Sequence, residues 1–328
     1  DDMADLIVST LTQGLIFALL SYGVYITYSV LDFPDLTVDS SFPLGAAVTA
    51  ILLLQGVNPW VTLLCAAGAG AIAGLCTGLI HVKLKVRDLL AGIITMTALS
   101  SINLVLAGSN VTVERAVDTI FTSPLTMTLF GDLSLTTRKL ILSLVLAVVI
   151  KLLLDLYFRT KSGLLLRATG DNGTLVTTLA QNKGNMKILG VVIANALVAL
   201  CGAVVCQEQR SYSAVMGIGQ VVFGLATVII GISLSRVPVK EAITDWRAYV
   251  VSLVRLILCP LVVWGVLRLF VSGTVLGVLT VIAACPSGAM ITILSLRYGV
   301  DETFATRVNF VSTVLCAGTL PLVTHILL

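Results

Sequence analysis

The sequence predicts an all-α fold, a polytopic transmembrane helical bundle that includes re-entrant or broken helices. Hydrophobic residues make up 57% of the 328 residues and charged residues only 11%, whereas a soluble domain carries about 25% charged residues. The mean hydropathy is +1.05. About seven to nine apolar stretches have the length that a bilayer crossing requires. Most of the surface must therefore face lipid or other helices.

Composition and motifs also narrow the class of function. The net charge of +3 is small and spread over loops, which argues against nucleic acid as a partner. The seven cysteines lie inside apolar runs without a C-x-x-C pair, so they are predicted to pack rather than to form disulfides or bind metal. The sequence has no P-loop, no metal cluster and no nucleophile–base pair. We therefore expect a chain that is not an enzyme and needs no cofactor.

The first crossing is predicted over residues 6–30. Because the chain starts with Asp1 and this stretch lacks a signal-peptide cleavage pattern, we expect residues to be missing before Asp1. In the next full crossing Gly70, Gly74 and Gly78 recur every fourth residue, which predicts close approach of a neighbouring helix. Further crossings are predicted at residues 61–80, 89–107, 140–158, 188–206, 248–270, 274–296 and 305–327, with a broken or re-entrant glycine-rich stretch at 214–234.

Basic residues predict the orientation of the loops. Residues 159–187 carry five of the 20 Lys and Arg residues, so this loop is predicted to be cytoplasmic. Counting alternate crossings from it places residues 235–246 and 297–303 inside as well, in agreement with their basic side chains. Residues 108–137 form the longest polar interval and are a candidate for a small amphipathic surface helix.

Three carboxylates, Asp32, Asp35 and Asp39, lie between the first two apolar runs and close to Pro34. A carboxylate in hydrocarbon is costly, so these side chains either reach water at the surface or line a hydrated path. The apolar run that follows, residues 44–54, is too short to span a bilayer alone. Two interpretations follow, an ordinary exterior loop or a re-entrant segment that lines a transport pathway.

Two other polar features stand out. Asn103 lies within an apolar run and can hydrogen-bond across the bundle. It can either join neighbouring helices or lie beside a pathway. In the cytoplasmic loop, Gly170 is predicted to end one element, and Asp171 or Asn172 to cap a new helix that runs to about Lys183. A short capped helix flanked by basic residues suits the docking of another protein.

Several segments together resemble one transporter family. They are residues 31–39 (LDFPDLTVD), 41–47 (SFPLGAA), 88–93 (DLLAGI), 101–104 (SINL), 166–172 (LRATGDN) and 216–220 (MGIGQ). These segments resemble ABC-importer permeases of the branched-chain amino acid type, and among them the tryptophan/tyrosine importer group. The resemblance covers about residues 5–234.

The resemblance implies a permease subunit that moves an amino acid or related small organic solute across the cytoplasmic membrane of a bacterium. It implies a homodimer in the lipid bilayer, with separate cytoplasmic ATPase subunits and an extracytoplasmic solute-binding protein. Residues 167–182 match the position of the helix that couples the permease to the ATPase. The residues assigned on this basis are Asp32, Pro34, Asp35, Asp39 and Asn103 in the translocation pathway, and Arg167, Ala168, Thr169, Gly170, Asp171 and Asn172 at the ATPase contact.

After Leu234 the resemblance changes. Residues 245–247 (DWR), 255–257 (RLI), 284–288 (ACPSG), 297–299 (RYG) and 310–313 (FVST) resemble the last part of the auxin-efflux-carrier family. There the proline-containing element belongs to a broken helix at the translocation site, which adds Pro286 to the pathway candidates. We therefore predict an ABC importer permease-like domain at residues 1–234 and auxin-efflux-carrier-like helices at 235–328. The alternatives are a secondary transporter of the auxin efflux type and a non-functional fusion of two truncated transporters.

Overall fold

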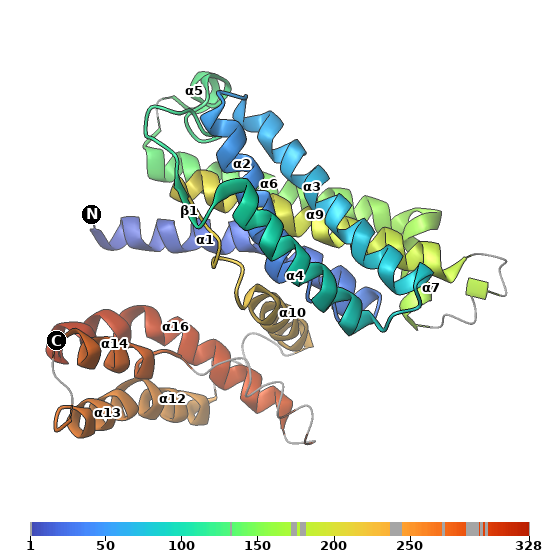
Figure 1. The fold of residues 1–328 in the computed structure, drawn as a ribbon. Coiled ribbons are helices and arrows are strands. Elements are labelled where there is room, and N and C mark those ends of the chain that lie inside the picture. The colour runs from blue at the N-terminus through green and yellow to red at the C-terminus, as the bar shows by residue number, and fades with distance from the viewer. Residues whose placement is uncertain are drawn as a thin grey trace. The chain divides into compact units, whose positions relative to one another are not determined.

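The described part of the chain is almost entirely helical, as the composition predicts (Figure 1). In this computed structural model the described residues are 2–131, 133–171, 176–177, 182–236, 245–270, 273–286, 295, 298 and 301–327. The chain divides into two compact units, Asp1–Leu225 and Ala226–Leu328. Each unit is considered by itself below.

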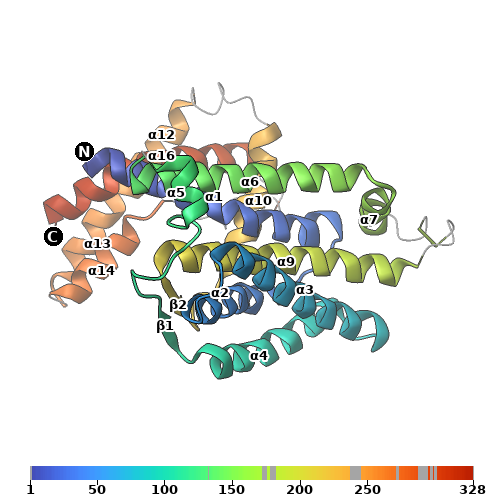
Figure 2. The same cartoon turned by 90° about the horizontal axis from the view of Figure 1, so that it is seen from above.

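The first unit is a helical bundle with one small β-ribbon (Figures 1 and 2). In the ribbon, β1 (Asn110–Thr112) pairs antiparallel with β2 (Ser211–Ser213). Its helices are α1 (Asp2–Val24), which continues as the π-helical segment η1 (Tyr25–Val30), α2 (Val38–Leu54), α3 (Pro59–Lys83), α4 (Asp88–Ala107), α5 (Pro124–Phe130), α6 (Leu135–Arg159), α7 (Lys161–Asp171) and α9 (Lys183–Gln209), followed by α10 (Gln220–Arg236), which runs past the end of the unit.

In the second unit α12 (Trp246–Leu253) packs against α16 (Glu302–Leu327). Ala248 of α12 contacts Val308 and Val311 of α16. The described elements are α12 (Trp246–Leu253), which continues through the π-helical segment η2 (Val254–Leu258) into α13 (Cys259–Leu267), then α14 (Thr274–Ala283) and α16 (Glu302–Leu327).

Helix caps in the second unit come from two aspartates. Asp245 accepts the backbone N–H of Arg247 at the start of α12, and its other oxygen lies 3.3 Å from the guanidinium of Arg307. Asp301 accepts the hydroxyl of Thr303 and the backbone N–H of Phe304 at the start of α16. The hydroxyl bond, together with the backbone bonds, lowers the pKa of the Asp301 carboxyl from its ordinary value.

Six of the described helical stretches are long and apolar enough to cross a membrane: Ile7–Val30, Pro59–Lys83, Asp88–Ala107, Leu135–Arg159, Lys183–Gln209 and Trp246–Leu267. They coincide with six of the predicted crossings and confirm the fold class. The predicted surface helix in residues 108–137 corresponds to α5, which is only seven residues long. In the glycine-rich stretch 214–234, residues 214–219 are non-helical, and α10 runs without interruption from Gln220.

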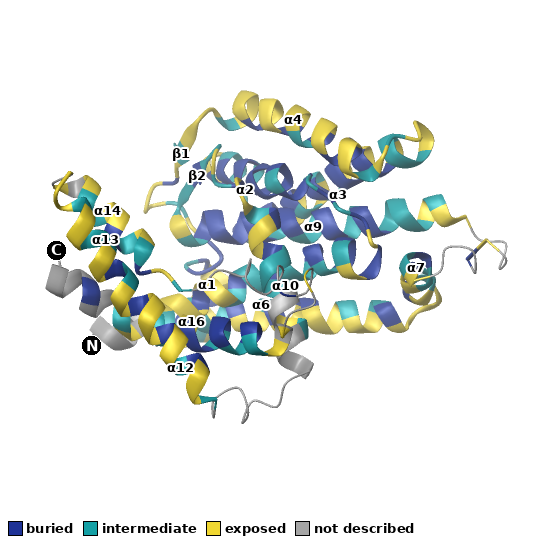
Figure 3. Ribbon diagram, turned by 90° about the horizontal axis from the view of Figure 1, so that it is seen from below, coloured by how far each residue is buried: buried dark blue, intermediate teal, exposed yellow. Residues whose placement is uncertain are grey.

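The helix α9 forms the centre of the first unit. Its apolar window is 61% buried, against 17% for that of α6, and Figure 3 shows α9 largely dark blue and α4 largely yellow. Small residues allow this burial. A Cβ atom on Gly45 of α2 would overlap the backbone of Ala199, and one on Gly202 of α9 would overlap that of Phe42. The glycines of α3 that recur every fourth residue, Gly70, Gly74 and Gly78, also face α9. A Cβ on Gly74, for example, would overlap the backbone of Val191.

This packing predicts unequal effects for two matched substitutions. Gly45→Ala should destabilise the protein by about 1–3 kcal/mol, because the added methyl group has backbone and no free space in front of it. Gly68→Ala, on the exposed side of α3 with nothing within 4 Å, should be neutral or slightly stabilising, by up to about 1 kcal/mol. The midpoint of heat unfolding in detergent measures both, and equal midpoints for the two variants would contradict the packing.

Candidate functional site

The second crossing of the first unit is broken. After η1 the chain leaves helical geometry at Leu31 and resumes it only at Val38. Leu31 lies against Gly190, near the start of α9, whereas Leu53 packs with Cys206, near the end of α9. The segment therefore runs along α9 from one end of the bundle to the other.

This course contradicts the ordinary exterior loop, one of the two interpretations that the sequence left open, because Phe33 and Asp35 are fully buried. The lining of a transport pathway stays a prediction. The 17 residues of α2 extend about 25 Å, short of the roughly 30 Å of a hydrocarbon core, and the extended residues before Val38 add to this length. The helix begins six residues earlier than the apolar run at 44–54 suggests. It can do so because the polar side chains in its first turns find partners on neighbouring helices.

Asp35 is the most deeply placed of the predicted pathway residues, with 0% of its surface exposed. Its Oδ1 accepts the backbone N–H of Thr37 at 2.9 Å, and its Oδ2 accepts the side-chain amide of Asn195 on α9 at 2.7 Å. The amide oxygen of Asn195 in turn accepts the hydroxyl of Ser41 on α2 at 2.7 Å. Among the described residues no ion pair includes Asp35. The carboxylate is therefore stabilised by neutral donors.

A pair of hydroxyls fixes the non-helical linker, residues 31–37, to α3. The hydroxyl of Thr37 lies 2.8 Å from that of Thr77, and both residues are fully buried. The sequence analysis did not single out Asn195, Ser41 or Thr77. The available signal for Asn195 was the one used for Asn103, a lone amide within an apolar run.

Asp39 begins a different interaction, with the start of α10. Its carboxylate accepts the backbone N–H groups of Val221 at 2.8 Å and Gly219 at 3.4 Å. A Cβ atom on Gly217 would overlap the carbonyl oxygen of Asp39, so the two segments are in backbone contact. Asp39 thus caps α10, where a negative charge also complements the helix dipole. In the segment 216–220, Gly217 is required by this contact, whereas Gly219 is required by its left-handed backbone, with φ of 83°.

Asn103 connects α4 to the first turn of α2. Its side-chain amide donates to the carbonyl oxygen of Ser40 at 3.1 Å. The Ser40 hydroxyl donates to the carbonyl oxygen of Met96 and lies 2.9 Å from the hydroxyl of Ser100. Asn103 is 2% exposed, and its side-chain oxygen has no partner among the described residues. That oxygen is itself buried, so leaving it unpaired carries a cost in free energy.

The structure brings some of the predicted pathway residues together and separates others. Asp35, Asp39 and Asn103 meet around the start of α2. Asp32 is exposed and adopts a left-handed conformation with φ of 49°, where the chain turns away from η1. Pro34 is half-buried in the extended linker. Pro286 follows α14 in the second unit, and the residues after it, 287–294, lie outside the described part of the chain.

The predicted ATPase-contact residues lie on α7. Residues 167–171 are all helical, and Asn172 lies outside the described residues. The expectation that Gly170 ends an element is met to within one residue, because α7 is described as far as Asp171. Most of the predicted helix from Asp171 or Asn172 to Lys183 lies outside the described residues. The glycine is needed for packing, since a Cβ atom there would overlap the carbonyl oxygen of Val30. Leu166, fully buried with Val30, anchors the same side of α7 to the bundle.

The other side of α7 is exposed. Lys161, Leu164, Arg167 and Asp171 recur every three or four residues along it, and Leu164 is 56% exposed. The guanidinium of Arg167 lies 4.8 Å from the ring centre of Phe158. A cavity of about 250 Å³ separates Arg167 and Asp171 from η1. The helix therefore presents one apolar and several charged side chains on an anchored support.

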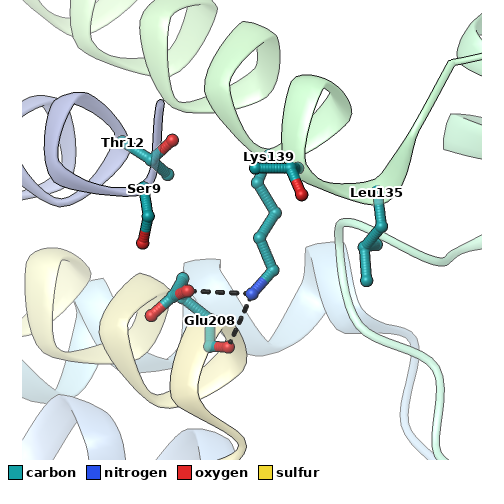
Figure 4. A pocket seen from close by; sticks show the side chains of 6 residues that line it. Ser9, Thr12, Leu135, Lys139 and Glu208 are labelled. Carbon is teal, nitrogen blue, oxygen red and sulfur yellow. Dashed lines mark hydrogen bonds and ion pairs between the residues drawn. The ribbon is translucent and has the colours of Figure 1, made fainter. Parts of the chain in front are cut away.

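The opposite end of the first unit carries a salt bridge beside a cavity. The ammonium group of Lys139 lies 2.8 Å from the Glu208 carboxylate. Figure 4 shows Lys139 extending from α6 to Glu208 at the end of α9, beside Ser9 and Thr12 of α1. This cavity measures about 260 Å³, and a neighbouring one of about 530 Å³ shares the ion pair and adds Arg115. These residues were not predicted from the sequence.

The two ends of the bundle also differ in charge. Lys83 and Asp88 lie at the same end as Arg159 and Lys183, since α3 and α6 both run toward it and α4 and α9 both run away. Both connecting segments, 83–88 and 159–183, are rich in Lys and Arg. The positive-inside rule therefore assigns this end, with α7, to the cytoplasm.

Comparison with known proteins agrees with this architecture. Residues 6–242 match the family described as the permease component of the branched-chain amino acid transport system, and residues 187–324 match a family described as membrane transport protein. The chain belongs to the first of these families. It is a multi-pass membrane protein of the transport-permease class.

Individual relatives match more than half of this chain. The tyrosine transport system permease protein of Clostridioides difficile is 40% identical over 230 residues, 70% of this chain and 74% of the relative. An uncharacterized protein of Rickettsia prowazekii is 31% identical over 69% of this chain and 77% of its own length. A probable branched-chain amino acid transport permease protein of Methanocaldococcus jannaschii is 31% identical over 57% of this chain and 61% of its own length. No solved structure matches the chain.

The contacts of Asp35 predict a difference between two otherwise similar substitutions. Asp35→Asn places an amide N–H₂ group against a donor, either Thr37 N–H or Asn195 N–H₂, and should cost about 1–3 kcal/mol. Asp32→Asn removes the same charge at an exposed position and keeps a residue that tolerates the left-handed conformation. The heat-unfolding midpoint should therefore fall for Asp35→Asn only. A normal midpoint for Asp35→Asn would show that its hydrogen bonds contribute little.

Proposed function

We propose that this chain is the permease subunit of an ABC importer that moves an amino acid, with tyrosine as the first solute to test. Separate ATPase subunits in the cytoplasm would drive it, and an extracytoplasmic binding protein would deliver the solute to a permease homodimer. Membership of the permease family and the relative named for tyrosine transport support this proposal. The observation that carries it is the anchored helix α7 at the basic end of the bundle.

The described part of α7 has the properties that transmission of force requires. Leu166 and Gly170 fix it to η1, so a push on its exposed side reaches the residues that precede the broken crossing. Those residues lead directly into Asp35 and the start of α2. Movement of α7 by closing ATPase subunits would thus act on the buried polar contacts, and the solute would pass by rigid-body rearrangement of the helices.

The ATPase contact can be tested with two matched charge inversions. Arg167→Glu, on the exposed side of α7, should reduce the amount of co-purified partner ATPase at least about tenfold, because it places a repulsive charge at the contact. Lys83→Glu, at an exposed lysine at the same end of the bundle but outside α7, should leave it unchanged. Retention of the ATPase by both variants would remove α7 from the proposed contact.

Transport itself separates the proposed function from its rival. Proteoliposomes that contain the chain, its ATPase and its binding protein should take up tyrosine only with ATP. The match of residues 187–324 to a second transport family favours a different outcome, uptake by the chain alone along an ion gradient. Nucleotide-independent uptake would support that secondary transporter, and no uptake with all partners present would support a non-functional fusion.

A further inference from the structure

A cavity at the basic end of the first unit is unexplained by the permease function. It measures about 510 Å³ and lies between the end of α3, the turn that leads into α4 and the start of α9. It shares no lining residue with α7 or with the contacts of Asp35. Four basic side chains line it, Lys85, Arg87, Lys183 and Lys187, against one carboxylate, Asp88.

The cavity has a defined wall. One ring nitrogen of His81, Nε2, lies 3.4 Å from the ammonium of Lys187, which can only donate. The other, Nδ1, therefore carries the proton and donates to the carbonyl oxygen of Val86 at 2.9 Å. Lys187 is half-buried and lies 5.8 Å from the ring centre of Phe33. One of the four cations is thus held in place, and the turn before α4 is tied to α3.

The charge of the cavity is not neutralised by the protein. None of the four basic side chains forms an ion pair with a carboxylate in the described part of the chain. The Asp88 carboxylate is itself engaged with the backbone N–H of Leu89 in the first turn of α4. Two helices, α4 and α9, also start here, and the positive end of a helix dipole attracts anions. Two N–H groups of α9, those of Gly184 and Asn185, are already bonded to the Asn182 side chain, so the four basic side chains supply most of the attraction. The cavity is therefore built for a multiply hydrogen-bonded anion such as a phosphate group.

The surroundings of the cavity indicate where the phosphate comes from. Leu84, Leu89 and Leu90 beside it are 69%, 47% and 50% exposed, and along α4 the exposed apolar surface continues at Ile93 and Ile94. A soluble anion would gain nothing from these side chains. In a membrane-spanning chain, basic side chains at the helix ends lie at the depth of the headgroups, and apolar side chains further along contact acyl chains.

We propose that this cavity binds the phosphate headgroup of an acidic phospholipid of the cytoplasmic leaflet, with the acyl chains along the exposed side of α4. This inference does not depend on the transported solute or on the ATPase. The lipid would join the ends of α3, α4 and α9, which otherwise meet there with like charges facing one another.

Native mass spectrometry of the delipidated protein in detergent tests the proposal. Phosphatidylglycerol should bind at least about tenfold more tightly than phosphatidylcholine with the same acyl chains. The variant Lys85→Gln/Arg87→Gln/Lys183→Gln should lose this preference. The control Arg159→Gln/Lys161→Gln/Arg167→Gln removes the same charge from the same end of the bundle and should keep it. The variant Lys85→Arg/Arg87→Lys/Lys183→Arg should keep it too, which separates lost charge from lost fold.

Three results would overturn the proposal. Equal loss of preference in the cavity variant and the control would mean that lipid binding depends only on the overall charge of this face. Unchanged preference in the cavity variant would place the lipid elsewhere. Displacement of phosphatidylglycerol by an equal concentration of glycerol 3-phosphate would show that the cavity binds soluble phosphates, with no contribution from the acyl chains.

Discussion

The amide side chain of Asn195 makes the interaction on which the rest of the first unit depends. Its N–H₂ group donates to the Asp35 carboxylate and its oxygen accepts the Ser41 hydroxyl, so one side chain on α9 binds both the extended linker and the helix that follows. A break in a membrane helix exposes backbone groups that lipid cannot satisfy, and it is tolerated only against protein or water. At this low dielectric an unpaired partner would be costly. The backbone N–H groups of Leu31 and Phe33 are bonded to carbonyl oxygens of η1, and that of Thr37 to the Asp35 carboxylate. Asn195 of α9 holds this carboxylate in place, so the break is stabilised by η1, by Asp35 and by α9 together.

Close helix packing is what allows Asn195 to make these contacts. A Cβ atom on Gly74 of α3 would lie 3.0 Å from the Cβ of Asn195, and one on Gly70 would overlap its backbone. The glycines of α3 thus bring α9 within reach of the linker, and the Thr37–Thr77 pair forms across the same approach. Small residues and buried polar groups serve one purpose here, which is to hold a non-helical segment at membrane depth.

Much of this architecture could be predicted from the sequence. The crossings were predicted because apolar length is a strong signal, and the cytoplasmic end because Lys and Arg gather in two loops. The partners of Asp35 could not be predicted, since Asn195 is 160 residues away and a lone amide does not reveal what it binds. The start of α2 was placed too late because Asp39, Ser40 and Ser41 read as loop residues until their partners on other elements are known.

The second role of Gly170 could not be predicted from the sequence. Glycine is common at helix ends, and α7 is described to within one residue of Gly170, but the same glycine also lets α7 contact the backbone of Val30. Arg167 and Asp171 lie on the exposed side of α7. In the proposed function, movement would pass from α7 through η1 to Asp35.

The central claim is that residues 31–54 form one broken crossing held to α9, so that the two ends of the segment lie on opposite sides of the membrane. Single cysteines at Asp32 and Gln55, both exposed, can be compared with the parent chain for reaction with a membrane-impermeant thiol reagent in intact cells. We expect Gln55→Cys to react in intact cells and Asp32→Cys to react only after the cytoplasmic side is opened. Reaction of both cysteines from the same side would contradict the account.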